Sequence, residues 1–163
     1  MIALGANLPS VYGAPAATLS KAVDVVQSRG INVLTRSGIW LTAPVPISDQ
    51  PWYHNAVIAV QTRLSPNDLL KELLSIENEF GRVRSERNAP RILDLDLLAY
   101  GDAHLNDADL TLPHPRMMER GFVLYPLLDV AAEWTHPVTG QRAQEAVRHL
   151  PPNQSAEKSS FVL

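Results

Sequence analysis

Cysteine is absent from this sequence of 163 residues. Its absence excludes a disulfide scaffold, a thiolate metal site and a cysteine nucleophile, and it is compatible with a reducing cytosol. Long apolar runs are missing too, since none approaches the ~20 residues that a membrane-spanning helix needs. The N-terminus also lacks the basic region of a signal peptide. These features predict a cytoplasmic protein that does not associate with membranes.

Lysine is scarce, with 3 residues against 11 arginines, and the net charge is −3. A negative net charge argues against a nucleic-acid partner. Four arginines fall between positions 82 and 91. Arginine bias can follow genomic base composition, but a local cluster favours forked contacts with phosphate or carboxylate. We therefore expect small anionic molecules as partners.

The predicted elements alternate as in an α+β fold. Apolar and β-branched runs predict strands at 2–6, 31–42, 53–63 and 92–100, with a bulge near Gly38. Helical spacing and capping signals predict helices at 15–28 and 66–80, and shorter helical segments within 119–134 and 143–150. The resulting β-α-β-β-α-β order matches a ferredoxin-like antiparallel sheet with two packed helices and C-terminal helical additions.

The length fits a single domain, which we place at residues 1–150. The remaining residues, 151–163, are mostly polar and are predicted to be a mobile tail. No stretch suggests an interface stripe, so a monomer is expected.

Two aspartates interrupt the leucine-rich strand "ILDLDLLAY" at Asp94 and Asp96. Residues two apart in a strand share a face, so the carboxylates lie about 7 Å apart at their strand positions and the leucines take the other face. Such a pair can converge on a hard cation such as Mg²⁺. A solvated acidic strand face remains the alternative for this pattern alone.

The arginines that directly precede these aspartates favour the metal interpretation. Phosphoryl transfer uses cations to neutralise phosphate oxygens and arginines to stabilise the charge of the transition state. The sequence contains neither a Walker A motif nor a G-x-G-x-x-G motif. A P-loop or Rossmann nucleotide site is therefore disfavoured.

A second group of residues suits a flat heterocycle. Tyr53 and Asn55 alternate onto one strand face, and Phe122 could supply an opposing ring. Taken alone, these residues are more often core aromatics with a turn-stabilising asparagine. His114, between two prolines in "LPHPR", is either a phosphate donor or a solvent-facing loop residue.

Five stretches together closely resemble the 6-hydroxymethyl-7,8-dihydropterin pyrophosphokinase family of folate biosynthesis. They are "LGANL", "DQPWYHNAV", "IENEFGRVR", "RNAPRILDLDLLAYGD" and "LTLPHPRMMERGFVLYPL". The resemblance runs from Ile2 to about Trp134. It implies a ferredoxin-like fold and transfer of pyrophosphate from ATP to the pterin hydroxymethyl group, with release of AMP.

The resemblance also implies the residues of the site. Two Mg²⁺ ions would be bound by Asp94 and Asp96, and Arg82 and Arg91 would act on the triphosphate. The pterin would be bound by Thr42, Pro44, Tyr53, Asn55 and Phe122. ATP would be bound by Glu77, Arg84, Thr111, His114 and Arg120.

The sequence departs from the family pattern at several positions. Asn88-Ala89 stands where the family often has Trp-Gly before the proline-arginine pair, and that tryptophan closes over the pterin. Leu74 and Asp109 replace a frequent glutamine and arginine, so adenosine contacts are expected to differ. Without the resemblance, another magnesium-dependent phosphoryl or nucleotidyl transferase with a flat acceptor stays open. A ferredoxin-like RNA-binding module is disfavoured by the acidic strand and net charge.

Overall fold

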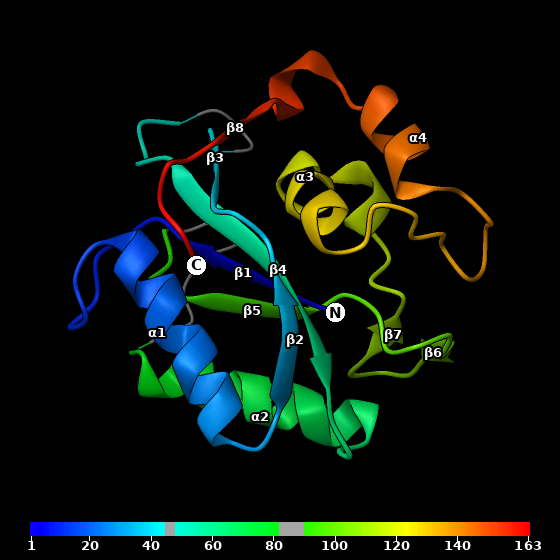
Figure 1. Cartoon of the computed structure of the whole chain (residues 1–163), viewed down its shortest axis with the longest axis horizontal. Helices are drawn as coiled ribbons and strands as arrows, with labels where there is room; N and C mark the ends of the chain where they lie inside the picture. Colours follow the sequence, from blue (N-terminus) through cyan, green and yellow to red (C-terminus); the bar gives the residue numbers. More distant parts are fainter. Residues whose placement is uncertain (45–47, 82–89) are drawn as a thin grey trace.

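The structure, a computed structural model, describes residues 1–44, 48–81 and 90–163. It is a mixed α/β fold built on an antiparallel sheet (Figure 1). The centre of the sheet is formed by β1 (Ile2–Ala6), flanked by β4 (Tyr53–Gln61) and β5 (Asp94–Leu97). β2 (Asn32–Arg36) and β3 (Trp40–Thr42) both pair with β4, and β8 (Ala156–Lys158) continues the sheet beyond β3.

The strand predicted at 31–42 is divided into β2 and β3. The division occurs at Ser37, whose N–H donates to the Val57 carbonyl at 2.9 Å. The Val57 N–H then donates to the Ser37 hydroxyl, also at 2.9 Å, instead of to a backbone carbonyl. A side-chain hydrogen bond therefore replaces one backbone hydrogen bond between the strands. The chain leaves regular strand geometry between the segment that pairs with β4 as β2 and the segment that pairs with it as β3.

α1 (Pro15–Ser28) and α2 (Pro66–Glu79) cover one face of the sheet (Figure 1). Both helices have the predicted bounds to within a residue, and the Ser65 hydroxyl caps α2 by accepting from the Asp68 N–H at 3.2 Å. The apolar faces of both helical segments are buried in the main core, which also contains strand residues such as Ile2 and Leu95. The residues of these two faces are Leu19, Ala22, Val23, Val26, Leu69, Leu73, Ile76 and Phe80.

The opposite face is partly covered by α3 (Gly121–Val130), which packs against β4, and α4 (Ala143–Arg148), which packs against α3. A short 3₁₀ turn, η1 (Met117–Glu119), leads into α3. A second apolar cluster forms here around Val57, Leu98 and Leu124. A small hairpin, β6 (Leu105–Asn106) and β7 (Thr111–Leu112), packs its two leucines against the main core. No helix in the described parts of the chain is long and apolar enough to cross a membrane.

The segment 151–163, expected from its polarity to be a mobile tail, adds to the sheet in this structure. A 3₁₀ turn, η2 (Pro152–Gln154), precedes β8, which pairs with β3 in the register Thr42↔Ala156. The final residue, Leu163, is buried in the main core. Backbone pairing with an otherwise open strand edge gives this polar segment a place that its composition did not predict.

Candidate active site

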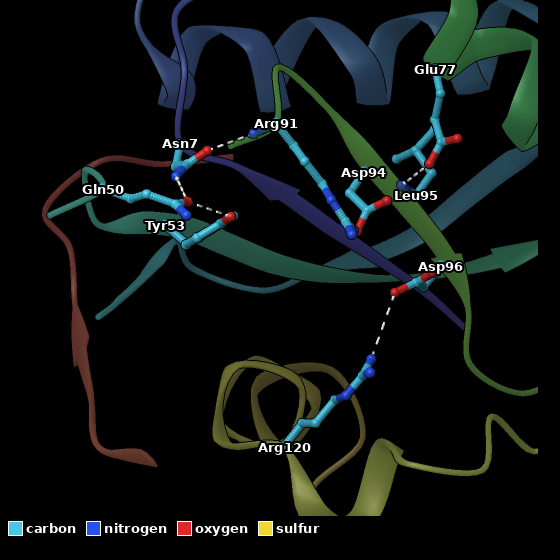
Figure 2. Close-up of polar contacts among 9 residues, drawn as sticks. All are labelled: Asn7, Gln50, Tyr53, Glu77, Arg91, Asp94, Leu95, Asp96 and Arg120. Atoms are coloured by element: carbon cyan, nitrogen blue, oxygen red, sulfur yellow. Dashed lines mark hydrogen bonds and ion pairs between the residues drawn. The ribbon is translucent and has the colours of Figure 1, made fainter. Parts of the chain in front are cut away.

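Asp94 and Asp96 project from β5 on the sheet face that is turned toward α3 (Figure 2). Leu95 and Leu97 point to the opposite face and are only 2% and 4% exposed, respectively. The alternation predicted for this strand is therefore confirmed. Burial of the leucines fixes the register of β5, and the register in turn fixes the position of both carboxylates.

β1 forms the floor beside these carboxylates, with Gly5 opposite Asp94 and Ala3 opposite Asp96. A Cβ atom on Gly5 would lie 3.5 Å from Asn55 Oδ1 and 3.9 Å from Asp94 Cβ. The absence of a side chain at Gly5 thus leaves open space between an amide on one side and a carboxylate on the other.

Two arginines lie against the two aspartates. The guanidinium of Arg91 forms an ion pair with Asp94, and Arg120 Nη1 lies 4.0 Å from Asp96 Oδ2 (Figure 2). Burial lowers the pKa of Arg120, while the charge of Asp96 acts in the opposite sense. The Arg120 guanidinium also stacks over the Phe122 ring at 5.4 Å from its centroid.

His114 follows the hairpin β6–β7 and presents a hydrogen-bond donor. Its Nδ1 atom accepts from the Arg116 N–H at 3.2 Å, so the neutral ring carries its proton on Nε2. Burial, aided by the positive charge of Arg120, lowers the pKa of His114. At neutral pH the ring is therefore uncharged and can donate from Nε2 to an anion.

Thr42 and Asn55 form a buried polar pair on neighbouring strands and are 6% and 4% exposed. Asn55 Nδ2 donates to Thr42 Oγ1 at 2.9 Å, and it lies 3.4 Å from the Trp40 carbonyl. These contacts fix the amide with its nitrogen toward the protein. Among the described residues, Oδ1 accepts no hydrogen bond, and it faces the open space above Gly5.

A buried asparagine at the end of β1 connects Arg91 to Tyr53 (Figure 2). Asn7 Oδ1 accepts from the Arg91 N–H at 2.7 Å, and the Arg91 carbonyl accepts from the Asn7 N–H at 3.0 Å. Asn7 Nδ2 donates to Gln50 Oε1 at 3.3 Å, and the Tyr53 hydroxyl donates to the same oxygen at 3.3 Å. Burial raises the pKa of Tyr53, so its hydroxyl stays protonated.

These side chains line one cavity of about 590 Å³. Ten of the residues predicted for the site contribute to its wall, and they come from four different parts of the chain. We call Arg91, Asp94, Asp96, His114 and Arg120 its charged end, and Thr42, Pro44, Tyr53, Asn55 and Phe122 its uncharged end.

Two predicted ATP residues are not part of this wall. Glu77 is 1% exposed on α2, beneath the sheet, where its Oε1 atom accepts from the Leu95 N–H at 2.7 Å (Figure 2). It therefore holds β5 from the helix side. Thr111 lies in β7, paired with Asn106. The predictions at Arg82, Arg84 and Asn88-Ala89 fall outside the described residues.

The site also depends on residues that the sequence did not single out as site residues. Gln50 lies in the cavity wall, and Asn7, buried behind the wall, donates a hydrogen bond to it. The "DQP" stretch next to Tyr53 was the available signal for Gln50. Gln154 lies in the polar tail, where nothing in the sequence pointed to a site. The cavity wall further includes Ser48, Arg116 and Gln154.

The donor set of the charged end suits Mg²⁺. Within residues 1–44, 48–81 and 90–163, no group of three or more His, Asp or Glu side chains could hold a metal ion. Mg²⁺ is commonly bound through one or two carboxylates, with waters and substrate phosphates completing its octahedron. Asp94 and Asp96 match that requirement, and the aligned Arg91 and Arg120 would face the phosphates.

The fold and this cavity suit one class of protein, a group-transfer enzyme with two substrates. One end offers paired carboxylates, guanidinium groups and an uncharged histidine, as a polyphosphate requires. The other offers aromatic rings and a fixed amide, as a flat heterocycle requires.

Comparison with known proteins identifies the family. The model of the 7,8-dihydro-6-hydroxymethylpterin-pyrophosphokinase (HPPK) family matches residues 1–132. A protein of Methylorubrum extorquens named 2-amino-4-hydroxy-6-hydroxymethyldihydropteridine pyrophosphokinase is 40% identical over 153 residues, which cover 93% of each chain. A Haemophilus influenzae protein of the same name is 42% identical and is covered to 83%. The chain belongs to this pyrophosphokinase family.

Other relatives are much longer than this chain. It is 44% identical to the folic acid synthesis protein fol1 of Pneumocystis carinii over 139 residues but spans only 18% of that protein. Among solved structures, a Plasmodium falciparum HPPK-DHPS triple mutant with STZ-DHP aligns with a TM-score of 0.71. That alignment covers 90% of this chain and 42% of the other at 14% identity, so it supports the fold alone.

Proposed function

We propose that this chain transfers pyrophosphate from ATP to the hydroxymethyl group of 6-hydroxymethyl-7,8-dihydropterin in folate biosynthesis. The observation that carries the proposal is the single cavity in which Asp94 and Asp96, paired with arginines, stand beside the Thr42–Asn55 pair. Family membership supplies the identity of the two substrates. The chemistry of the two ends of the cavity supports a site for each of them.

The bonds that change are the same for any pyrophosphoryl transfer. The hydroxymethyl oxygen attacks the β-phosphorus of ATP and loses its proton. The bond from that phosphorus to the oxygen bridging to the α-phosphorus breaks, and AMP leaves with this oxygen. The products are AMP and the pyrophosphate ester of the pterin.

The uncharged end binds and orients the acceptor. Asn55 Oδ1, held outward because Nδ2 is bound to Thr42, accepts from a ring N–H. Tyr53 and Phe122 stack on the pterin faces, and Pro44 contributes to the wall. Alignment of the acceptor oxygen with phosphorus then contributes much of the rate enhancement.

The charged end binds the triphosphate. Asp94 and Asp96 would hold Mg²⁺, two ions by family resemblance, which would neutralise phosphate oxygens. Arg91 and Arg82 act on the phosphates during transfer. Arg120 and His114 bind ATP, the latter as an uncharged donor from Nε2. Glu77, Arg84 and Thr111 remain predicted ATP residues, although Glu77 and Thr111 lie outside the cavity wall.

We also propose a ferredoxin-like topology and a monomeric state for this chain. The order β5-β1-β4 with β2 on the far side of β4, all antiparallel, supports a ferredoxin-like unit. A monomer in the cytoplasm remains the expectation from the sequence.

Calorimetry with a non-hydrolysable ATP analogue, magnesium and hydroxymethyldihydropterin tests the proposal. The pterin should bind tightly when analogue and magnesium are both present. Failure of the pterin to bind under these conditions would rule out the assignment.

A further inference from the structure

The junction that carries Arg120 is held by a side chain from the C-terminal segment. Arg120 lies between the last residue of η1 and the first residue of α3. The amide of Gln154, in η2, bridges the two sides of this junction. Its Oε1 atom accepts from the Gly121 N–H at 2.9 Å, and its Nε2 atom donates to the Glu119 carbonyl at 2.8 Å.

These two bonds fix both peptide groups that flank the Arg120 Cα atom. The Glu119 carbonyl belongs to the peptide before Arg120, and the Gly121 N–H belongs to the peptide after it. Helix ends leave such groups without partners inside the helix. No side chain of the junction caps α3 itself, so Gln154 supplies the cap from a distant part of the chain.

Gly121 allows the C-terminal segment to approach this closely. A Cβ atom at position 121 would lie 2.2 Å from the backbone oxygen of Gln154, a distance that real Cβ atoms do not reach. The sequence "RGF" thus places a glycine where the chain of η2 passes, directly between two side chains of the cavity wall.

The segment that carries Gln154 is anchored to both walls of the cavity. β8 pairs with β3, which bears Thr42, and Lys158 Nζ contacts Asp129 Oδ1 of α3 at 2.9 Å. Asp129 Oδ2 in turn accepts from Trp40 Nε1 at 3.0 Å. Burial would raise the pKa of Asp129, but its hydrogen bonds lower it on balance, so the carboxylate is charged. In Figure 1 this segment is drawn in red beside β3.

We propose that Gln154 is a positioning residue for the charged end, acting through Arg120. By fixing the peptides on both sides of Arg120, it directs the guanidinium toward Asp96 and the phosphate site. The inference rests on the proposed function, and Gln154 lies beyond the residues 1–132 that the family model matches. The tail of this chain is thereby part of the apparatus that binds ATP.

Gln154→Met tests the inference because it keeps the length of the side chain and removes both hydrogen bonds. Loss of both hydrogen bonds should lower kcat/KM for ATP roughly tenfold. We expect a similar loss of affinity for the ATP analogue by calorimetry. Asn153→Ala is the matched control: it changes an exposed side chain of the same turn that makes no hydrogen bond within the described residues. It should behave as wild type.

A double-mutant cycle separates positioning from general damage to the fold. If Gln154 acts through Arg120, Gln154→Met should add less than roughly twofold to the loss caused by Arg120→Met. Fully additive losses, or a Gln154→Met variant equal to an active wild type, would overturn the inference alone. A wild-type protein that neither binds the analogue nor releases AMP would overturn the proposed function and the inference with it.

Discussion

The two ends of the cavity are organised differently, although they share the floor formed by β1. At the uncharged end, Asn55 and Thr42 are nearly buried and bonded to each other and to the backbone. At the charged end, the arginines are paired with the aspartates and both partners are partly exposed, with 32% for Arg91 and 18% for Asp94.

This difference indicates that the uncharged end is pre-organised, whereas the ion pairs of the charged end can be replaced by contacts with a ligand. A buried, satisfied hydrogen-bond pair keeps one geometry. Partly exposed ion pairs contribute little to stability, so their loss on ligand binding costs little. In the pairs Arg91–Asp94 and Arg120–Asp96, a metal ion could therefore take the place of each arginine beside its aspartate. The negatively charged triphosphate could likewise take the place of each aspartate beside its arginine. The acceptor would meet a rigid pocket and the nucleotide an adaptable one.

The largest effect is expected at the aspartates. Asp94→Asn or Asp96→Asn should lower kcat roughly a thousandfold, because metal charge stabilisation is worth several kcal/mol. Steady-state assays over a range of magnesium concentrations measure the loss, which added magnesium should restore only in part. Asp102→Asn, at an exposed turn, is the control. A wild-type rate in both aspartate variants would contradict metal binding at the charged end.

Arg91→Met should slow the chemical step roughly a hundredfold, because a charge aligned on the transferring group is lost. Single-turnover kinetics measures this step apart from binding, and affinity for the ATP analogue should change less than the rate. Arg142→Met changes an exposed arginine and serves as control. An unchanged single-turnover rate would take Arg91 out of the mechanism.

Asn55→Ala should affect only the uncharged end. We expect pterin affinity to fall roughly tenfold, since a fixed acceptor is worth about 1–2 kcal/mol. The affinity for the ATP analogue should stay within roughly twofold of wild type. Calorimetry with each ligand makes the comparison, with Asn106→Ala in the β6–β7 hairpin as control. Equal losses for both ligands would contradict the separation of the two ends.

The smallest effect concerns the pH dependence of stability. Because the pKa of His114 is lowered in the folded state, the unfolded chain binds more protons as the pH falls below the ordinary histidine value. The contribution of His114 is full above that value and is lost toward lower pH. Urea unfolding from pH 7.5 to about 5.5 should show a shallower decline for His114→Gln than for wild type. An unchanged slope, equal to that of the control His149→Gln, would contradict this.

Local sequence patterns correctly predicted the structure on the sheet face that α1 and α2 cover. The alternation of Leu95 with Asp94 and Asp96, and the capping of α2 by Ser65, depend on near neighbours in the chain and can be read from them. The ten predicted residues that line the cavity come from distant parts of the chain. Their assignment to one site came from the family resemblance, because spacing along the chain relates only near neighbours.

The rest depends on contacts between distant segments. Gln154 meets Gly121, and Asn7 meets Arg91, only after the chain has folded. Likewise, Ser37 divides the predicted strand because its hydroxyl reaches Val57, and β8 forms because β3 offers an edge. None of these partners is marked by local sequence, so each was missed or misplaced.

The nucleotide product tests the central claim most directly. Wild-type protein should be incubated with ATP, magnesium and 6-hydroxymethyl-7,8-dihydropterin, and the nucleotides separated by chromatography. We predict AMP in one-to-one proportion to the pterin pyrophosphate ester, with none formed when the pterin is omitted. Formation of ADP, or consumption of ATP without AMP, would contradict the account.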